Sequence, residues 1–147
     1  MKAYKVVKVL RNGSRVSTMI PNWSPLYKVY IHNGIKKIVD SGFLFSLKGH
    51  AIDWAEDQKN HDCQICAEIK PYENLEVWEV EFKGVISRNK VVSPLYLIDK
   101  ETFSDFYRKF KTDFEKMIIA ANSRKQTTKQ IEASFIAKNI ILTQKIH

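Results

Sequence analysis

Cysteine, glycine, proline and long apolar runs are all scarce in this chain. Its 147 residues include two cysteines, five glycines and four prolines. Two cysteines are too few for the disulfide framework of a small secreted domain, so we expect an intracellular protein. No apolar run approaches the roughly 18 residues that a membrane-spanning helix needs, and we expect no membrane partner. Residues 1–5 begin a strand-like pattern rather than a secretory signal, which predicts a cytoplasmic location.

Catalytic signatures are also missing. The sequence contains no phosphate-binding glycine loop, G-x-S-x-G elbow, H-E-x-x-H zinc motif or dinucleotide fingerprint. Two of the five glycines stand in expected turns, at Gly13 and Gly34. We therefore expect a non-enzymatic protein that needs no cofactor.

Acidic residues are scarce at the start of the chain. The first fifty positions carry nine lysines and arginines against Asp40 alone. Residues 51–100 reverse the balance with six basic and ten acidic side chains, and residues 101–147 carry nine and five. The net charge of +8 is therefore unevenly distributed along the chain. Such polarity predicts a basic surface, and a basic surface favours an anionic partner.

Two Asn-Gly pairs predict two β-hairpins, because Asn-Gly tolerates the positive φ angles of a two-residue type I′ turn. The first hairpin joins residues 4–10 to 15–20 through Asn12-Gly13, and the second joins 26–32 to 35–39 through Asn33-Gly34. Each hairpin then has one apolar face and one wetter, basic face. In the first hairpin we expect an apolar face made of Val7, Val9, Val16 and Ile20, and an opposite face made of Lys8, Arg15 and Ser17. In the second hairpin we expect a wetter face made of Lys28, Tyr30, His32 and Lys37.

Further strands are expected at residues 42–47, 76–86 and 91–98, and Ser46 is expected to cap a helix that runs to about residue 60. An aromatic stripe at spacings of three and four predicts a long amphipathic helix over 99–121, and any exposed part of it would favour a homodimer. From residue 124 we expect a C-terminal helix, with a free basic arm, or a helix followed by a strand from Ile140, as alternatives. These elements predict a single α+β domain over 1–147. Residues 1–98 form mostly antiparallel sheet with one short helix, and residues 99–147 form a helical C-terminal part.

The basic hairpin faces are the leading candidate site. Cations interleaved with an aromatic ring suit phosphate contact and base stacking, which favours nucleic acid or a nucleotide as the partner. The alternative is a solvated sheet face whose lysines discourage edge-to-edge aggregation. The C-terminal segment is a second basic candidate, with an ordinary solvated helix as its alternative. The predicted anion-binding residues are Lys8, Arg15, Lys28, Tyr30, His32, Lys37, Arg124, Lys125 and Lys129.

Metal binding has one weak candidate. His61, Cys63 and Cys66 form an H-x-C-x-x-C motif that fits half of a tetrahedral zinc site. A second pair of cysteines or histidines at standard spacing is missing, so two ordinary cysteines are the favoured interpretation.

Two further features keep other functions open. Asp53, Glu56 and Asp57 share a helix face, which leaves a small nucleotide-processing enzyme as an alternative, although a solvated face is favoured. Trp23 lies in a loop between two prolines and is a candidate interface anchor. If Trp23 and the C-terminal segment both anchor a partner, the protein is an inhibitor that binds another protein, and we keep this as an alternative function.

The first eighty or so residues resemble small uncharacterised proteins that are common in bacteriophage genomes. The resemblance is carried by the Tyr4-Lys5-Val6-Val7 start, the Tyr27 and Tyr30 segment, Gly42-Phe43-Leu44-Phe45 ahead of a helix containing Ala51, and Trp78-Glu79-Val80. It brings no catalytic residues. It implies a protein that disables host components, such as a defence complex containing nucleic acid or its nucleotide signal. We therefore expect an inhibitor of host defence whose basic surface binds nucleic acid, a nucleotide, or an acidic or nucleic-acid-containing host protein complex.

Overall fold

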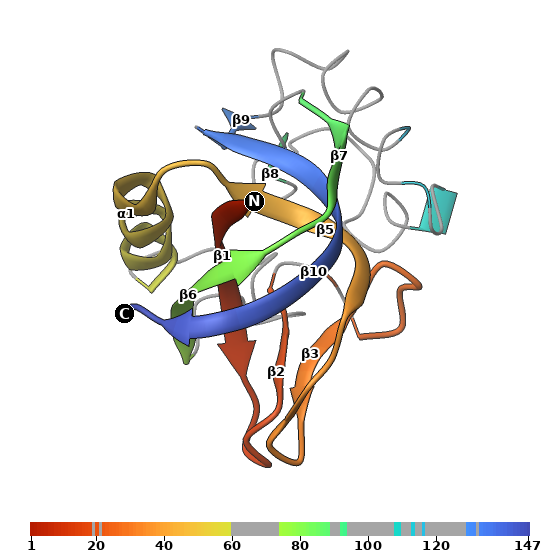
Figure 1. The fold of residues 1–147 in the computed structure, drawn as a ribbon, viewed down its shortest axis with the longest axis vertical. Helices are drawn as coiled ribbons and strands as arrows, with labels where there is room; N and C mark the ends of the chain where they lie inside the picture. The colour runs from red at the N-terminus through yellow and green to blue at the C-terminus, as the bar shows by residue number, and fades with distance from the viewer. Residues whose placement is uncertain are drawn as a thin grey trace.

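Antiparallel β-sheet dominates the structure, and one helix packs against it (Figure 1). The computed structural model describes residues 1–18, 20, 22–59, 74–88, 92–93, 108–109, 113, 116, 129–131 and 133–147. At this level the predicted α+β class is confirmed. The elements within the described ranges are β1 (Lys2–Val9), β2 (Arg15–Ser17), β3 (Val29–His32), β4 (Ile35–Lys36), β5 (Val39–Phe45), α1 (Lys48–Lys59), β6 (Leu75–Glu81), β7 (Gly84–Ser87), β8 (Val92–Ser93), β9 (Lys129–Gln130) and β10 (Ser134–Lys145).

The main sheet closes on itself. β1 pairs with β6 along most of its length and with β5 at Tyr4 and Phe45. β10 pairs with β5 along its first half and with β6 near its end. β1, β5, β10 and β6 therefore form a closed hydrogen-bonded circuit, to which the other strands of this sheet are attached. β8 and β9 form a separate pair.

β10 makes the closure possible, because it bends between two sets of neighbours (Figure 1). Asn139 has a φ of 55°, and the pairing register shifts once against β7 and once against β6. Such irregularities bend a strand and increase its twist. The predicted C-terminal helix is therefore wrong over residues 134–145, whereas the alternative of a strand from Ile140 is confirmed over 140–145. Ser134 to Ala137 are all buried, so this segment lacks the polar and apolar alternation that marks a half-exposed strand.

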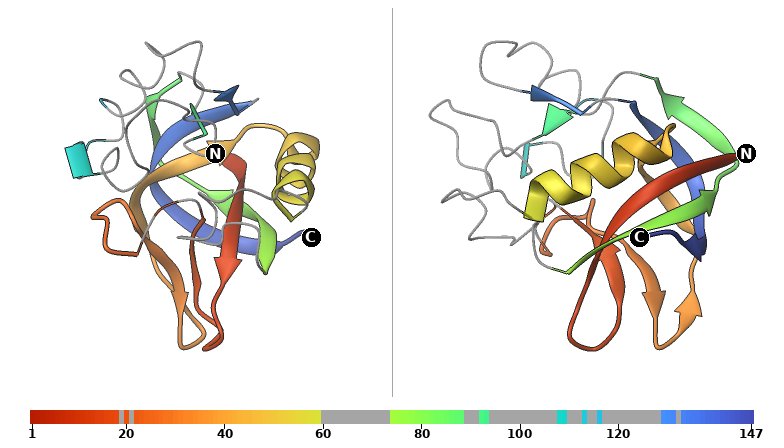
Figure 2. Two further views of the ribbon diagram at one scale, coloured as in Figure 1. Left: turned by 180° about the vertical axis from the view of Figure 1, so that it is seen from behind. Right: turned by 90° about the vertical axis from the view of Figure 1, so that its left-hand side faces the viewer.

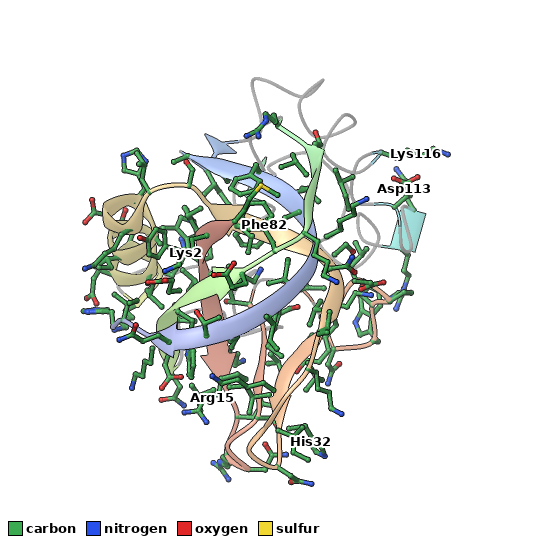
Figure 3. The ribbon with its side chains drawn as sticks, in the orientation of Figure 1. Lys2, Arg15, His32, Phe82, Asp113 and Lys116 are labelled. Carbon is green, nitrogen blue, oxygen red and sulfur yellow. The ribbon has the colours of Figure 1, made fainter. Side chains whose placement is uncertain are left out.

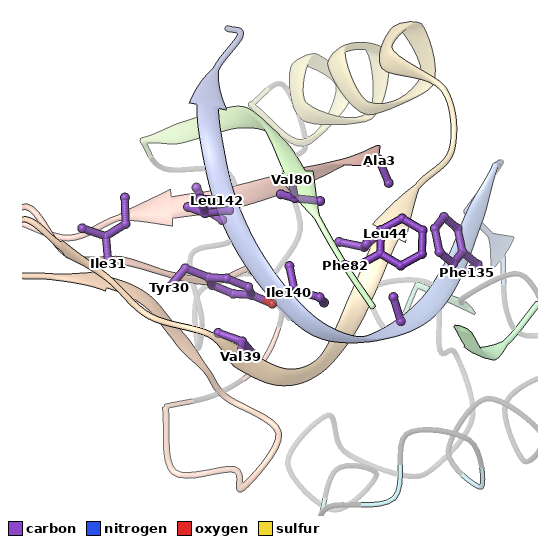
Figure 4. Close-up of a cluster of buried hydrophobic side chains, with 12 residues drawn as sticks. Ala3, Tyr30, Ile31, Val39, Leu44, Val80, Phe82, Phe135, Ile140 and Leu142 are labelled. Carbon is purple, nitrogen blue, oxygen red and sulfur yellow. The ribbon is translucent and has the colours of Figure 1, made fainter. Parts of the chain in front are cut away.

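The core lies within the closed sheet (Figure 4). Tyr30, Leu44, Val80 and Ile140 are fully buried there, from four different strands. The helix α1 covers another side of the sheet, beside β1 (Figure 2). Its Ala51 and Ala55 are fully buried, and the Trp54 ring lies 5.9 Å from that of Phe43 and 5.7 Å from that of Phe45. In these packed layers the apolar side chains supply most of the stabilisation.

The first hairpin turns differently from the prediction. Gly13 has a φ of 85°, its N–H donates to the carbonyl of Leu10, and Leu10 N–H donates to the carbonyl of Ser14. Residues 11–13 thus form a three-residue turn with glycine in the left-handed position. The register is one residue away from that of a two-residue turn, so Lys8 pairs with Val16. A shift of one residue exchanges the faces, and the predicted grouping of Lys8 with Arg15 is wrong.

In the second hairpin His32 pairs with Ile35 across Asn33 and Gly34, whose φ angles are 50° and 75°. Tyr30 was predicted on the wetter face of this hairpin, and this is wrong because its side chain is fully buried. The closed sheet turns this position toward the core (Figure 4). Ile35, by contrast, is exposed.

The predicted helix over 99–121 lies outside the described residues except for Arg108, Lys109, Asp113 and Lys116. Ser46 does not cap α1: its hydroxyl donates to the carbonyl of Ala133, and the first helical hydrogen bond runs from Ala51 N–H to the carbonyl of Leu47. No helix in the described part of the chain has the length and apolar character needed to cross a membrane.

Candidate anion-binding surface

The two hairpins bring basic side chains together at one end of the sheet. Arg15 pairs with Ile31, and Ile31 pairs with Lys36. Directly paired residues lie on the same face, so Arg15 and Lys36 flank Ile31. His32 lies at the neighbouring tip, where its Nδ1 is 3.3 Å from the Ser14 hydroxyl (Figure 3). Residues far apart in β2 and β4 thus share one surface.

Glu76 of β6 lies at the centre of this surface. Arg15 donates from Nε to Oε1 at 2.9 Å and from Nη2 to Oε2 at 3.4 Å. Lys145 Nζ lies 3.0 Å from Oε2, and the indole N–H of Trp78 donates to Oε1 at 3.1 Å. Burial acts to raise the pKa of Glu76, but these donors outweigh it and hold the pKa at about 2. The carboxylate is therefore ionised at neutral pH.

Lys36 reaches the same place from β4. Its Nζ donates to the carbonyl of Thr143 at 2.9 Å and lies 5.6 Å from the centre of the Trp78 ring, within cation–π range. We call Arg15, Lys36 and Lys145, with Trp78 and Glu76, the cationic cluster. Its three cations and one carboxylate leave an excess of positive charge. The side chains of Lys145 and Arg15 are 54% and 27% exposed, against 12% for Glu76, so solvent meets mainly the cations.

The predicted binding residues are distributed more widely than expected. Arg15 belongs to the cationic cluster, and His32 and Lys37 are exposed near the hairpin tips. Lys28 forms an ion pair with Asp40 at 3.0 Å. Lys8 is half-buried on the opposite face from Arg15, and Tyr30 is buried. Their roles in binding remain predictions, although a buried Tyr30 cannot stack on a base from solvent.

Several predicted residues fall outside the described part of the chain. These are Arg124, Lys125, His61, Cys63 and Cys66, whereas Lys129 lies in β9. Among described residues, no group of three or more histidine, cysteine or acidic side chains is arranged to hold a metal ion. The H-x-C-x-x-C motif, which is only a weak zinc candidate, lies outside these residues.

The other two candidates have their own partners. Trp23 is 41% exposed, and the Arg108 guanidinium lies 4.9 Å from the centre of its ring. In the acidic helix, Glu56 contacts His147 Nε2 at 2.7 Å and Lys59 Nζ at 3.0 Å. The hydrogen bond from His147, followed by that from Lys59, lowers the pKa of Glu56.

A buried amine lies next to the cationic cluster, because Lys5 of β1 pairs with Trp78 of β6. Lys5 is 1% exposed, and its Nζ donates to the carbonyl of Phe43 at 2.9 Å and lies 3.9 Å from the centre of the Phe43 ring. Burial lowers the pKa of Lys5 to about 7. The Tyr30 hydroxyl is also buried. A Cβ on Gly42 would lie 2.6 Å from that hydroxyl, so only glycine fits there without displacing it.

Sequence reasoning missed most of the cationic cluster and the buried amine. Lys145 and Trp78 become neighbours only because β10 pairs with β6, at the end of a segment expected to be helical. Lys5 carries a local signal, since it stands between Ala3 and Val7 on the inward side of an alternating strand.

No protein-family model, curated protein or solved structure gives a significant match to this chain.

Proposed function

We propose that this protein is a non-enzymatic binding protein whose cationic cluster contacts the phosphates of a nucleic acid. The observation that carries the proposal is the convergence of Arg15, Lys36 and Lys145 from three strands onto one partly exposed surface. Lysine and arginine bind phosphate by charge-assisted hydrogen bonds, and each neutralised phosphate releases condensed counterions. The proposed partner is thus recognised by its repeated negative charge.

Trp78 and His32 add a reason to favour nucleic acid. Trp78 is half-buried among the cations, and His32 is exposed at the hairpin tip. Aromatic side chains beside a basic surface provide stacking contacts for unpaired bases, and this contact tolerates any sequence. We therefore place single-stranded nucleic acid ahead of duplex as the ligand.

A protein partner is the second candidate, and Trp23 favours it. A partly exposed tryptophan beside an arginine has the composition typical of interface hot spots. For either candidate, the setting of a phage inhibitor of host defence is a proposal that rests on the resemblance of the first eighty residues.

Fluorescence anisotropy of a short labelled single-stranded oligonucleotide, measured over a range of salt concentrations, tests the proposal. For single strands the logarithm of the affinity should fall with the logarithm of salt by about 0.7 per neutralised phosphate. Lys36→Gln should weaken binding several-fold and reduce that slope by about 0.7, because one phosphate contact is lost.

Lys2→Gln is the matched control. Lys2 is also an exposed lysine, and it forms an ion pair with Glu79 at 3.1 Å, but it lies at the far end of β1 from the hairpin turn (Figure 3). Trp78 of the cationic cluster pairs with Lys5, and Lys2, three residues away along the strand, lies on the opposite face. The control should bind like the wild type. Equal losses in the two variants, or no salt-dependent binding by the wild type, would exclude the cationic cluster as the nucleic-acid site.

A further inference from the structure

We infer that Glu76 is a built-in competitor that occupies an anion subsite formed by Arg15, Lys145 and the Trp78 indole, and that it restricts this surface to polyanions. The inference rests on the proposed function and deepens it. It assigns a specificity role to an acidic residue within a basic site.

The donors around Glu76 match those of an external anion site. Arg15 meets both carboxylate oxygens, Lys145 adds an ammonium, and the third donor is the Trp78 N–H. Forked arginine donors of this kind recognise phosphate as well as carboxylate. The carboxylate thus fills the position that two phosphate oxygens of a ligand would take.

The exposures indicate how a ligand gains access. Lys145 and Arg15 are both more exposed than Glu76, so their outer sides are open to solvent while the carboxylate lies beneath them. An incoming phosphate can therefore approach the cations before Glu76 is displaced. The ammonium group of Lys36 donates to the carbonyl of Thr143 and lies beside this route of approach.

The selectivity follows from effective concentration. A tethered group competes as though it were present at millimolar concentration or above, so a single free anion at lower concentration displaces it poorly. A nucleic acid places further phosphates near Lys36, and these contacts add to the affinity without facing the competitor. Glu76 therefore weakens binding of mononucleotides and inorganic phosphate more than binding of an oligonucleotide.

A purely structural role for Glu76 predicts the opposite result. If the carboxylate only holds Arg15 and Lys145 in position, its removal lets these side chains scatter, and every anion should then bind more weakly. The sign of the affinity change therefore separates the two roles.

The test compares Glu76→Gln with Glu79→Gln. Glu79 lies on the same strand but on its other face, where it forms an ion pair with Lys2, so it controls for the loss of one negative charge. We expect Glu76→Gln to bind the labelled oligonucleotide several-fold more tightly than Glu79→Gln. Its salt slope should be steeper by about 0.7 for each additional phosphate contact.

A second measurement uses inorganic phosphate alone as the probe. In ³¹P NMR titrations the phosphate signal should broaden or shift with Glu76→Gln at concentrations where the wild type and Glu79→Gln have no effect. Circular dichroism shows whether Glu76→Gln folds. If it does not, Glu76→Asp replaces it, because this variant keeps the charge but shortens the side chain. Glu76→Asp should likewise bind phosphate and the oligonucleotide more tightly than the wild type.

The two proposals fail in different ways. If the wild type binds no oligonucleotide, the proposed function is wrong, and the phosphate titration still decides whether the subsite exists. If the wild type and Lys36→Gln behave as expected but Glu76→Gln binds no more tightly than Glu79→Gln, the inference about Glu76 is wrong and the proposed function stands.

Discussion

Replacing the buried amine of Lys5 should abolish a specific pH dependence of folding. In the folded protein, burial lowers the pKa of Lys5 from 10.5 to about 7. Between these values the unfolded chain holds a proton that the folded protein lacks, so the free energy of unfolding rises with pH. Below pH 7 both states are protonated, and the contribution of Lys5 to stability is at its lowest.

The magnitude follows from the pKa values. The fall in the pKa of Lys5 from 10.5 to about 7 corresponds to about 5 kcal/mol, since each pKa unit is worth about 1.4 kcal/mol. The contact of the ammonium with the Phe43 ring, at 3.9 Å, opposes this effect by favouring the charged form by about 2 kcal/mol. We therefore expect a rise of about 3–5 kcal/mol across the whole window.

Urea unfolding monitored by tryptophan fluorescence measures the part of this rise that lies between pH 7 and about 9.5. The pH series should stop below about 9.5, because tyrosines of the unfolded chain ionise near pH 10. Burial raises the pKa of the neighbouring Tyr30, so that hydroxyl stays protonated in the folded protein throughout the series. Lys5→Met should flatten the profile and stabilise the protein most strongly near pH 6.

Lys48→Met is the control, because Lys48 is exposed at the start of α1. It should keep the wild-type profile. The reasoning is refuted if Lys5→Met retains the same rise between pH 7 and 9.5, or if the wild type loses stability over that range.

Two further predictions concern packing and acid stability. Gly42→Ala should lower the free energy of unfolding by about 1–3 kcal/mol in thermal or urea unfolding, because its Cβ meets the Tyr30 hydroxyl. Adding Tyr30→Phe removes that hydroxyl and should recover part of the loss. If nothing is recovered, the strain lies elsewhere. Glu76 has a folded pKa of about 2 against an ordinary 4.5, so its contribution to stability is complete above pH 4.5 and disappears as the pH falls toward 2. Glu76→Gln should therefore unfold with a shallower dependence on acid pH than Glu79→Gln, and parallel acid profiles would contradict the ionic role of Glu76.

The turns show how far local sequence patterns determine this fold. Asn12-Gly13 marks the correct hairpin, but glycine satisfies both a two-residue turn and the third position of a three-residue turn. The hydrogen bond from Leu10 N–H to the carbonyl of Ser14 belongs to the longer turn. The pairing register of β1 and β2 therefore differs by one residue from that of a two-residue turn, and Lys8 lies on the opposite face from Arg15. No pattern within the strand reveals this.

The cationic cluster depends on contacts between distant parts of the chain. Arg15 and Glu76 meet because β2 and β6 both flank β1, and Lys145 joins them only through β10. A helix was expected at the start of β10 because residues 134–137 are all buried and so lack a period of two, whereas a strand from Ile140 was kept as an alternative. Sequence patterns therefore predict the basic character of this protein more readily than the identity of the residues that share its surface.

The closure of the sheet has a consequence for synthesis of the chain. β10 is translated after β1, β5 and β6, yet it is the partner that both β5 and β6 require. Until β10 emerges from the ribosome, these strands present unpaired edges and apolar side chains such as Leu44 and Val80 to solvent. Folding is thus delayed by long-range pairing, and the nascent chain is most prone to aggregate just before β10 is made.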